Sequence, residues 1–101
     1  MSNNIVESIG VPATLEQMAE ECCELAMACM KMARKLRDEN PTPKSIEDIR
    51  DNLVEEMADV SLCYDVILHE TNLVSVREMT DIMFEKDERW RKRINLHLDL
   101  D

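Results

Sequence analysis

Two short acidic segments, EECCE and EEMAD, contain the residues of this chain that are best suited to chemistry. Each segment holds two acids three positions apart: Glu21 and Glu24 in the first, Glu56 and Asp59 in the second. Residues three apart lie side by side on an α-helix. Each pair also borders an apolar stripe, so two packed antiparallel helices would bring four carboxylates together. Their mutual repulsion would raise their pKa values, and bound Mg²⁺, which prefers oxygen ligands, would offset it.

The acid pairs have a simpler alternative explanation. Carboxylates three apart are common on solvated helix faces, and this chain carries 22 acids against 12 bases. The same doublet followed by an acid three positions later occurs in both segments, each time at an apolar edge. That repetition favours a shared site, although a solvated face stays open on spacing alone.

Three long helices are expected to position these acids. The first is predicted from about Leu15 to Arg37, with Thr14 as the N-cap and Gln17 as its capping-box partner. Apolar residues then recur in steps of three and four. The segment DENPTPK at 38–44 contains two prolines and predicts a loop.

The second and third helices have clear start signals. Ser45 and Ser75 are each followed three residues later by an acid, which is typical of a helix N-terminus. The second helix is predicted to run to about Glu70, and the third carries its inner apolar face to Ile94. The residues that follow have no clear assignment.

Composition limits the fold and the partners. A 101-residue chain with one glycine and 3% aromatic residues predicts a single all-α domain with an aliphatic, sulfur-rich core. A net charge of −10 disfavours nucleic acid and anionic membranes as partners. No apolar run approaches the roughly 18 residues of a membrane span, and the start of the chain lacks a signal-peptide pattern. A cytoplasmic location is therefore expected.

The two acidic segments also carry a family resemblance. EECCE (20–24) followed by EEMAD (55–59) resembles the EExxE…ExxD signature of MazG-like nucleoside triphosphate pyrophosphohydrolases. The surrounding KLR, NPTP, NLVEEMADV and FEKDERW segments are similar as well, so the likeness covers residues 14–94. The 31 residues between Glu24 and Glu56 are at the long end for the family. This length fits its small phage-like members, and the expected location is the cytoplasm of a bacterium or a phage-infected host cell.

The resemblance implies an enzyme. Such proteins hydrolyse the α–β phosphoanhydride of NTPs or dNTPs, with Mg²⁺ as cofactor and Mn²⁺ as a possible substitute, to give the monophosphate and pyrophosphate. By position in the motif, the metal ligands would be Glu21, Glu24, Glu56 and Asp59. Glu20 matches the first glutamate of the motif and is expected to orient water or support a ligand.

Basic residues are the candidates for binding the triphosphate. Lys31 follows Glu24 by seven positions and shares nearly the same helical face. Five bases crowd into residues 86–93, and the resemblance suggests Lys86 and Arg89 as phosphate contacts. The alternative is that these charges complement the C-terminal end of the third helix dipole.

The expected architecture is an antiparallel bundle of about three main helices per chain. Wide apolar faces predict that a homodimer, or a homotetramer built as a dimer of dimers, completes a four-helix-bundle-like core. The predicted organisation is an arm over residues 1–11, a MazG-like helical domain over 12–95 and a tail over 96–101. A di-iron site is excluded because neither histidine completes a Glu-x-x-His pair. A non-enzymatic oligomeric adaptor, whose acids only keep it in solution, stays open.

Overall fold

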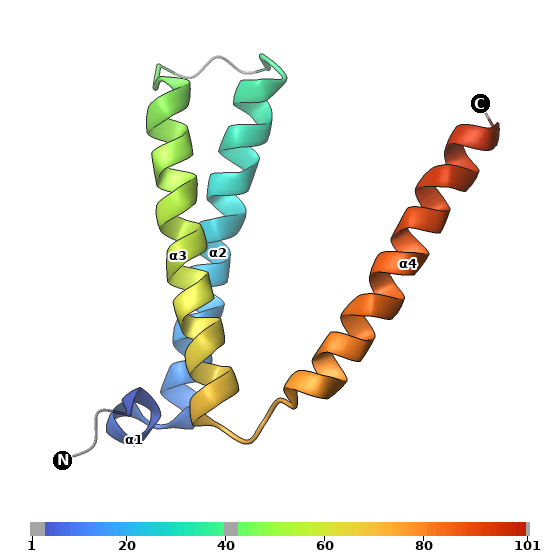
Figure 1. Ribbon diagram of the computed structural model, residues 1–101. Coiled ribbons are helices and arrows are strands. Elements are labelled where there is room, and N and C mark those ends of the chain that lie inside the picture. Colours follow the sequence, from blue (N-terminus) through green and yellow to red (C-terminus); the bar gives the residue numbers. More distant parts are fainter. Residues whose placement is uncertain (1–3, 40–42, 101) are drawn as a thin grey trace. The chain divides into compact units, whose positions relative to one another are not determined.

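The computed structural model describes residues 4–39 and 43–100, with side chains through Asn95, and these residues are all-helical (Figure 1). The helices are α1 (Ile5–Ile9), α2 (Val11–Leu36), α3 (Ile46–Glu70) and α4 (Val76–Leu100). No strand occurs in the described residues, which confirms the all-α prediction. The chain divides into two compact units, one ending at Thr71 and one beginning at Asn72, and each is described by itself.

Helix α2 begins earlier than the sequence predicted. Thr14 is not the N-cap: it lies inside the helix, is buried, and its hydroxyl donates a hydrogen bond of 2.8 Å to the carbonyl of Gly10. The helix starts directly after Gly10, whose φ of +92° is a conformation that glycine adopts without strain. Pro12 fits the first turn because backbone N–H groups there need no helical partner. The sole glycine of the chain therefore marks the boundary between α1 and α2.

The end of α2 is a C-terminal motif closed by two backbone hydrogen bonds. The amides of Asp38 and Glu39 donate to the carbonyls of Lys35 and Arg34, at 3.2 and 3.0 Å. Asp38 takes the left-handed conformation that this motif requires, with φ of +56°. The predicted loop at 38–44 is confirmed where it is described, at both of its ends; residues 40–42 lie outside the described residues.

The predicted N-caps of the two later long helices are confirmed. The Ser45 hydroxyl accepts a hydrogen bond from the amide of Asp48 at 3.1 Å, and α3 starts at the next residue. Ser75 accepts in the same way from Glu78 at 3.3 Å. These bonds satisfy amide groups that have no partner within the first turn of a helix.

Helices α2 and α3 form an antiparallel pair, and they lie side by side in Figure 1. The buried apolar residues of the pair are Ala28, Ile49, Val66 and Ile67. Ala28 is 1% exposed, and its small side chain lets the two backbones approach closely. This pairing fixes which side chains of α2 meet those of α3.

Helix α1 is attached near the end of α3. The backbone amide of Val6 donates to Oε1 of Glu70 at 3.1 Å, and the Val6 side chain is buried. Asn4 caps the short helix by accepting from the amide of Glu7 at 3.1 Å. The N-terminal segment thus includes a small docked helix that packs against both α2 and α3.

Helix α4 makes up most of the second unit. Its surface carries ion pairs one turn apart, between Arg91 and Asp87 at 2.9 Å and between Lys92 and Glu88 at 3.6 Å. The backbone stays helical to Leu100, through most of the segment predicted as a tail; residue 101 lies outside the described residues. Within the described part of the chain, no helix combines the length and apolar composition needed to cross a membrane.

Candidate metal centre

Three of the four predicted metal ligands converge between α2 and α3. Glu21 from α2 and Glu56 and Asp59 from α3 each offer one carboxylate oxygen, and these three oxygens lie within 4.8 Å of one another. All three residues are half-buried. The spacing of three on α3 places Glu56 and Asp59 on one face, and the antiparallel pairing brings Glu21 opposite them.

Glu56 combines an unpaired carboxylate oxygen with a raised pKa. Its Oε2 atom is buried and has no hydrogen-bond partner among the described residues. Burial raises the pKa of Glu56 from its ordinary value of 4.5, and the negative charge of Asp59 is the next cause. The charges of Glu24, Glu21 and Glu55 raise this pKa further. A half-buried carboxylate that has one oxygen without a donor and other acids around it is in a site that would favour a cation.

The two remaining predicted acids are not part of this cluster. Glu24 is exposed and close enough for its charge to raise the pKa of Glu56, but it is not part of the group of three oxygens. Glu20 is exposed on the same helix. The structure therefore brings together Glu21, Glu56 and Asp59, with Glu24 near Glu56 and Glu20 outside the group.

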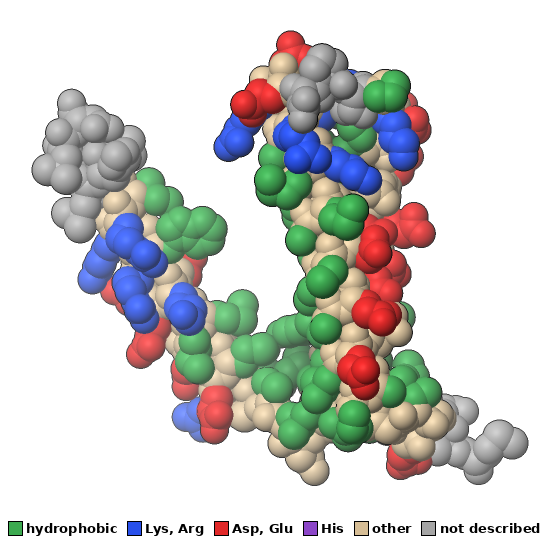
Figure 2. All heavy atoms as spheres, turned by 180° about the vertical axis from the view of Figure 1, so that it is seen from behind, with side chains coloured by type: hydrophobic (Ala, Val, Ile, Leu, Met, Phe, Trp, Pro, Cys, Tyr) green, Lys and Arg blue, Asp and Glu red, His purple; other side chains and the backbone are tan. Residues whose placement is uncertain are grey.

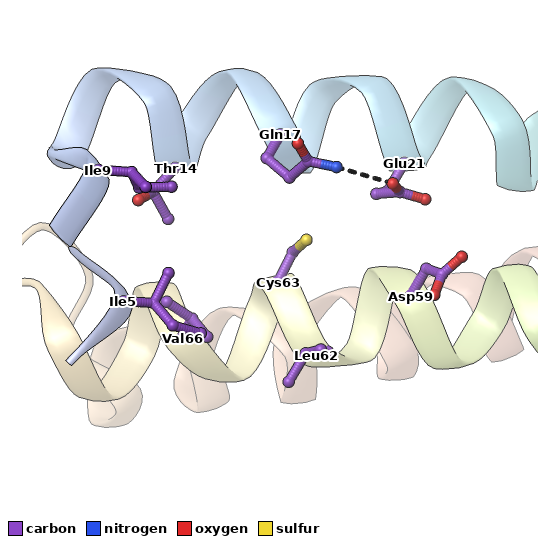
Figure 3. A pocket seen from close by; sticks show the side chains of 9 residues that line it. All are labelled: Ile5, Ile9, Thr14, Gln17, Glu21, Asp59, Leu62, Cys63 and Val66. Carbon is purple, nitrogen blue, oxygen red and sulfur yellow. Dashed lines mark hydrogen bonds between the residues drawn. The ribbon is translucent and has the colours of Figure 1, made fainter. Parts of the chain in front are cut away.

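Gln17 contacts Glu21 at this site, and the sequence did not predict this contact. Its Nε2 donates a hydrogen bond of 2.8 Å to Oε1 of Glu21 (Figure 3). The sequence had suggested Gln17 as a capping-box partner of Thr14, which is wrong because α2 begins a turn earlier. The spacing of four between Gln17 and Glu21 was the available signal, since such pairs are neighbours on a helix surface.

An apolar pocket of about 240 Å³ opens beside the acid cluster. Ile5 and Ile9 of α1 and Leu62 and Val66 of α3 supply apolar walls, and all four are seen in Figure 3. Glu21 and Asp59 lie at the opposite end of the view from Ile5 and Ile9. These two carboxylates belong both to the pocket lining and to the acid cluster. Thr14, Gln17 and Cys63 complete the lining. Helix α1 thus helps to form a wall of the candidate site.

Cys63 is the cysteine nearest to this chemistry. It is half-buried and lines the pocket, whereas Cys22, Cys23 and Cys29 are exposed. Burial raises the pKa of the Cys63 thiol, and the charges of Glu21 and Asp59 raise it further. The thiol is therefore held in its protonated, less reactive form.

The basic candidates lie away from the three acids or in the second unit. Lys31 is exposed on α2, and its backbone is about 15 Å along the helix axis from that of Glu21, ten residues earlier. It lines a shallow hollow with Arg34, Met27 and Met30. Lys86 and Arg89 are exposed on α4, where Arg89 lies in a hollow with Glu85, Glu88 and Lys92.

A scan against protein-family models, a search of curated proteins and a search of solved structures each found no match to this chain. The resemblance of the acidic segments therefore rests on the motif residues themselves. The carboxylates of Glu21, Glu56 and Asp59 form the candidate site by their geometry.

Proposed function

We propose that this chain is a Mg²⁺-dependent, MazG-like pyrophosphohydrolase that converts NTPs or dNTPs to the monophosphate and pyrophosphate. The observation that carries the proposal is the buried, unpartnered Oε2 of Glu56 within a cluster of three carboxylates from two helices. This arrangement is costly for a protein that uses its acids only as a solvated surface, because a buried acceptor without a donor loses its hydration. A divalent cation would remove that cost.

The residues present fit Mg²⁺. The donor set consists only of carboxylate oxygens, which suits hard cations, and it lacks the thiolate or imidazole that zinc prefers. Glu21, Glu56 and Asp59 would hold the ion. Mg²⁺ is commonly bound by a few carboxylates together with substrate phosphates, which suits an open cluster beside a pocket. Mn²⁺ has the same preference for oxygen and would serve as a substitute.

The chemistry requires attack by water on a phosphorus next to the α–β bridging oxygen and cleavage of that P–O bond. A bound divalent cation would polarise the phosphoryl group and shield the triphosphate from this acidic protein. The proton released by the water needs an acceptor, and a carboxylate that is not occupied as a ligand can take it. Glu24, which is exposed near Glu56, and Glu20, which is exposed on the same helix, are the residues we assign to orienting the water and accepting its proton.

The apolar pocket is our candidate site for the organic part of the nucleotide. It adjoins Glu21 and Asp59, so a ligand with its phosphates at the cluster would have its base within reach of the walls formed by Ile5 and Ile9. Most ligand pockets combine such apolar walls with a few polar groups. As phosphate contacts, Lys31, Lys86 and Arg89 stay predictions from the sequence.

Assembly with a second copy is part of the proposal. Large apolar side chains are exposed along the α2–α3 pair, and Figure 2 shows them beside the acidic side chains. Examples are Leu15, Met27, Met30, Val54 and Met57. A pair of helices covers only part of two wide apolar faces, and burying the rest is favourable. We propose a homodimer or a dimer of dimers with a four-helix-bundle-like core, acting in the cytoplasm where nucleoside triphosphates are found.

The same exposed apolar surface would suit the alternative, an oligomeric adaptor without enzymatic activity. The two functions differ in their response to Mg²⁺. A pyrophosphohydrolase should be stabilised by millimolar Mg²⁺ with nucleotide, because a ligand that binds only the folded state raises its stability. An adaptor should melt at the same temperature with or without them.

The direct test is incubation of the purified chain with each canonical NTP and dNTP and Mg²⁺, with products separated as pyrophosphate or phosphate. We expect monophosphate and pyrophosphate, loss of turnover in Glu56→Gln, and turnover retained in Glu55→Gln, which removes a neighbouring charge outside the cluster. Release of single phosphates, or full activity in Glu56→Gln, would overturn the proposal.

The pocket assignment has its own test, which compares two positions on α1. Ile9→Asp places a carboxylate in the apolar wall, and Ser8→Asp places one on the adjacent residue, which is exposed and outside the lining. We expect Ile9→Asp to raise KM for the nucleotide several-fold more than Ser8→Asp does. Equal effects of the two variants would exclude the pocket from nucleotide binding.

A further inference from the structure

Gln17 occupies a distinctive place at the candidate site. It lies one helical turn before Glu21, donates to Glu21 Oε1 at 2.8 Å, and lines the apolar pocket (Figure 3). It is also the sole glutamine of the chain. Gln17 therefore contacts both the apolar pocket and one of the three converging carboxylates.

The hydrogen bond from Gln17 affects how Glu21 can bind a cation. A glutamate side chain has two oxygens and several rotamers, and fixing it costs conformational entropy. Because the exposed Gln17 side chain donates to Oε1, it favours one orientation of the carboxylate and does not engage Oε2. Part of the conformational entropy that Glu21 would lose on binding a ligand is therefore already lost in the free protein.

The amide is also the suitable type of donor at this position. A lysine or arginine would form an ion pair with Glu21 and cancel part of the negative charge that attracts a divalent cation. The neutral amide of Gln17 donates a hydrogen bond and leaves the charge of the three carboxylates intact. Groups that orient metal ligands through hydrogen bonds typically change metal affinity by about 10–100-fold when they are removed.

We propose that Gln17 is a positioning residue that holds Glu21 in the orientation that binds the divalent cation. This inference rests on the proposed function, because it requires that the cluster of Glu21, Glu56 and Asp59 binds Mg²⁺. It goes further by assigning a role to a residue outside the acidic motif.

The hydrogen bond itself can be tested without metal. Labelling the full-length protein with glutamine carrying ¹⁵N in the side chain gives the signals of a single amide group, because Gln17 is the only glutamine. We expect Glu21→Ala to shift these signals in metal-free protein, and titration of the wild type with Mg²⁺ to move them. Mn²⁺ should broaden them through its unpaired electrons. Signals that are the same in Glu21→Ala and the wild type would overturn the inference.

The effect on cation binding is tested with Gln17→Met, which keeps the length of the side chain and removes the donor. We expect the Kd for Mg²⁺, measured by calorimetry, to rise about tenfold or more. The half-saturating Mg²⁺ concentration for hydrolysis should rise by a larger factor than kcat falls. The control is Arg91→Met, which removes another side-chain hydrogen bond with the same spacing of four residues, the ion pair with Asp87 at 2.9 Å on the exposed surface of α4.

The Mg²⁺ affinities of the wild type and the variants distinguish the positioning role of Gln17 from the proposed function. If the wild type binds Mg²⁺ and Gln17→Met binds it with the same Kd, the positioning role is refuted and the proposed function stands. If the wild type binds neither Mg²⁺ nor Mn²⁺, the proposed function falls and the positioning role falls with it. A fall in affinity in Arg91→Met equal to that in Gln17→Met would also refute the inference, because the effect would then be general.

Discussion

Replacing Glu56 by glutamine should raise the melting temperature of the metal-free protein and reduce its stabilisation by Mg²⁺. The change removes one negative charge from the cluster and keeps the shape of the side chain. Without metal, the variant should melt at a higher temperature than the wild type at pH 7.5, because the amide avoids repulsion by Asp59 and Glu21 and can be buried at lower cost. With Mg²⁺ this advantage should disappear, since the variant lacks one ligand.

The pH dependence of the metal-free effect follows from the raised pKa of Glu56. A carboxyl group whose pKa is higher in the folded than in the unfolded chain contributes full stability below its ordinary value of 4.5. That contribution is lost as the pH rises through the folded-state pKa. The difference in melting temperature between Glu56→Gln and the wild type in EDTA should therefore grow from about pH 4.5 upward and level off above the folded-state pKa.

The size of the Mg²⁺ effect can be estimated from binding linkage. At a concentration tenfold above Kd, a ligand specific for the folded state adds RT ln 11, about 1.4 kcal/mol. For a domain of this size, that amounts to a rise of roughly 6–11 °C in the melting temperature. If Glu56→Gln weakens binding at least tenfold, its rise under the same conditions should not exceed about 3 °C.

Differential scanning fluorimetry across this pH range measures the melting temperature in EDTA and its rise with Mg²⁺. Glu55→Gln is the matched control, because it removes the same charge one residue away from the cluster. The control should keep the full Mg²⁺ response and gain less in EDTA. An equal Mg²⁺ response in Glu56→Gln and Glu55→Gln would refute the metal site. A lower melting temperature of Glu56→Gln in EDTA at pH 7.5 would refute the repulsion argument.

Three further predictions concern the packing of α2 against α3, the N-cap of α3 and the thiol of Cys63. Ala28→Leu should destabilise the protein by about 1–3 kcal/mol in urea unfolding, because Ala28 is 1% exposed in the helix pair, whereas Ala26→Leu at an exposed position should change little. Ser45→Ala should cost about 1 kcal/mol in the same assay through loss of the α3 N-cap, and an unchanged midpoint would contradict the cap. Cys63 should be alkylated by iodoacetamide at pH 8 more slowly than Cys29, as followed by mass spectrometry of labelled peptides, because its thiol pKa is raised. Equal rates would contradict that assignment.

Much of the fold could be predicted from the sequence because it depends on local spacing. Ser45 and Ser75 were identified as N-caps from an acid three residues later, and the structure shows both hydrogen bonds. The start of α2 was missed for an equally local reason: Thr14 has the right residue type for a cap, but the positive φ of Gly10 sets the boundary one turn earlier. Residue type alone does not reveal the backbone conformation that a neighbour adopts.

The sequence by itself determined that Glu56 and Asp59 share a helical face and that Glu21 borders the apolar stripe of another helix, since a period of 3.6 residues fixes these directions. Only the tertiary structure decided that Glu21, and not Glu24, joins the cluster. That choice depends on the axial offset and rotation of α2 against α3, which are set by the packing of buried residues such as Ala28 and Ile49. Helix α1, which lines the pocket, is likewise placed by tertiary contacts. These contacts join residues far apart in the chain, such as Val6 and Glu70.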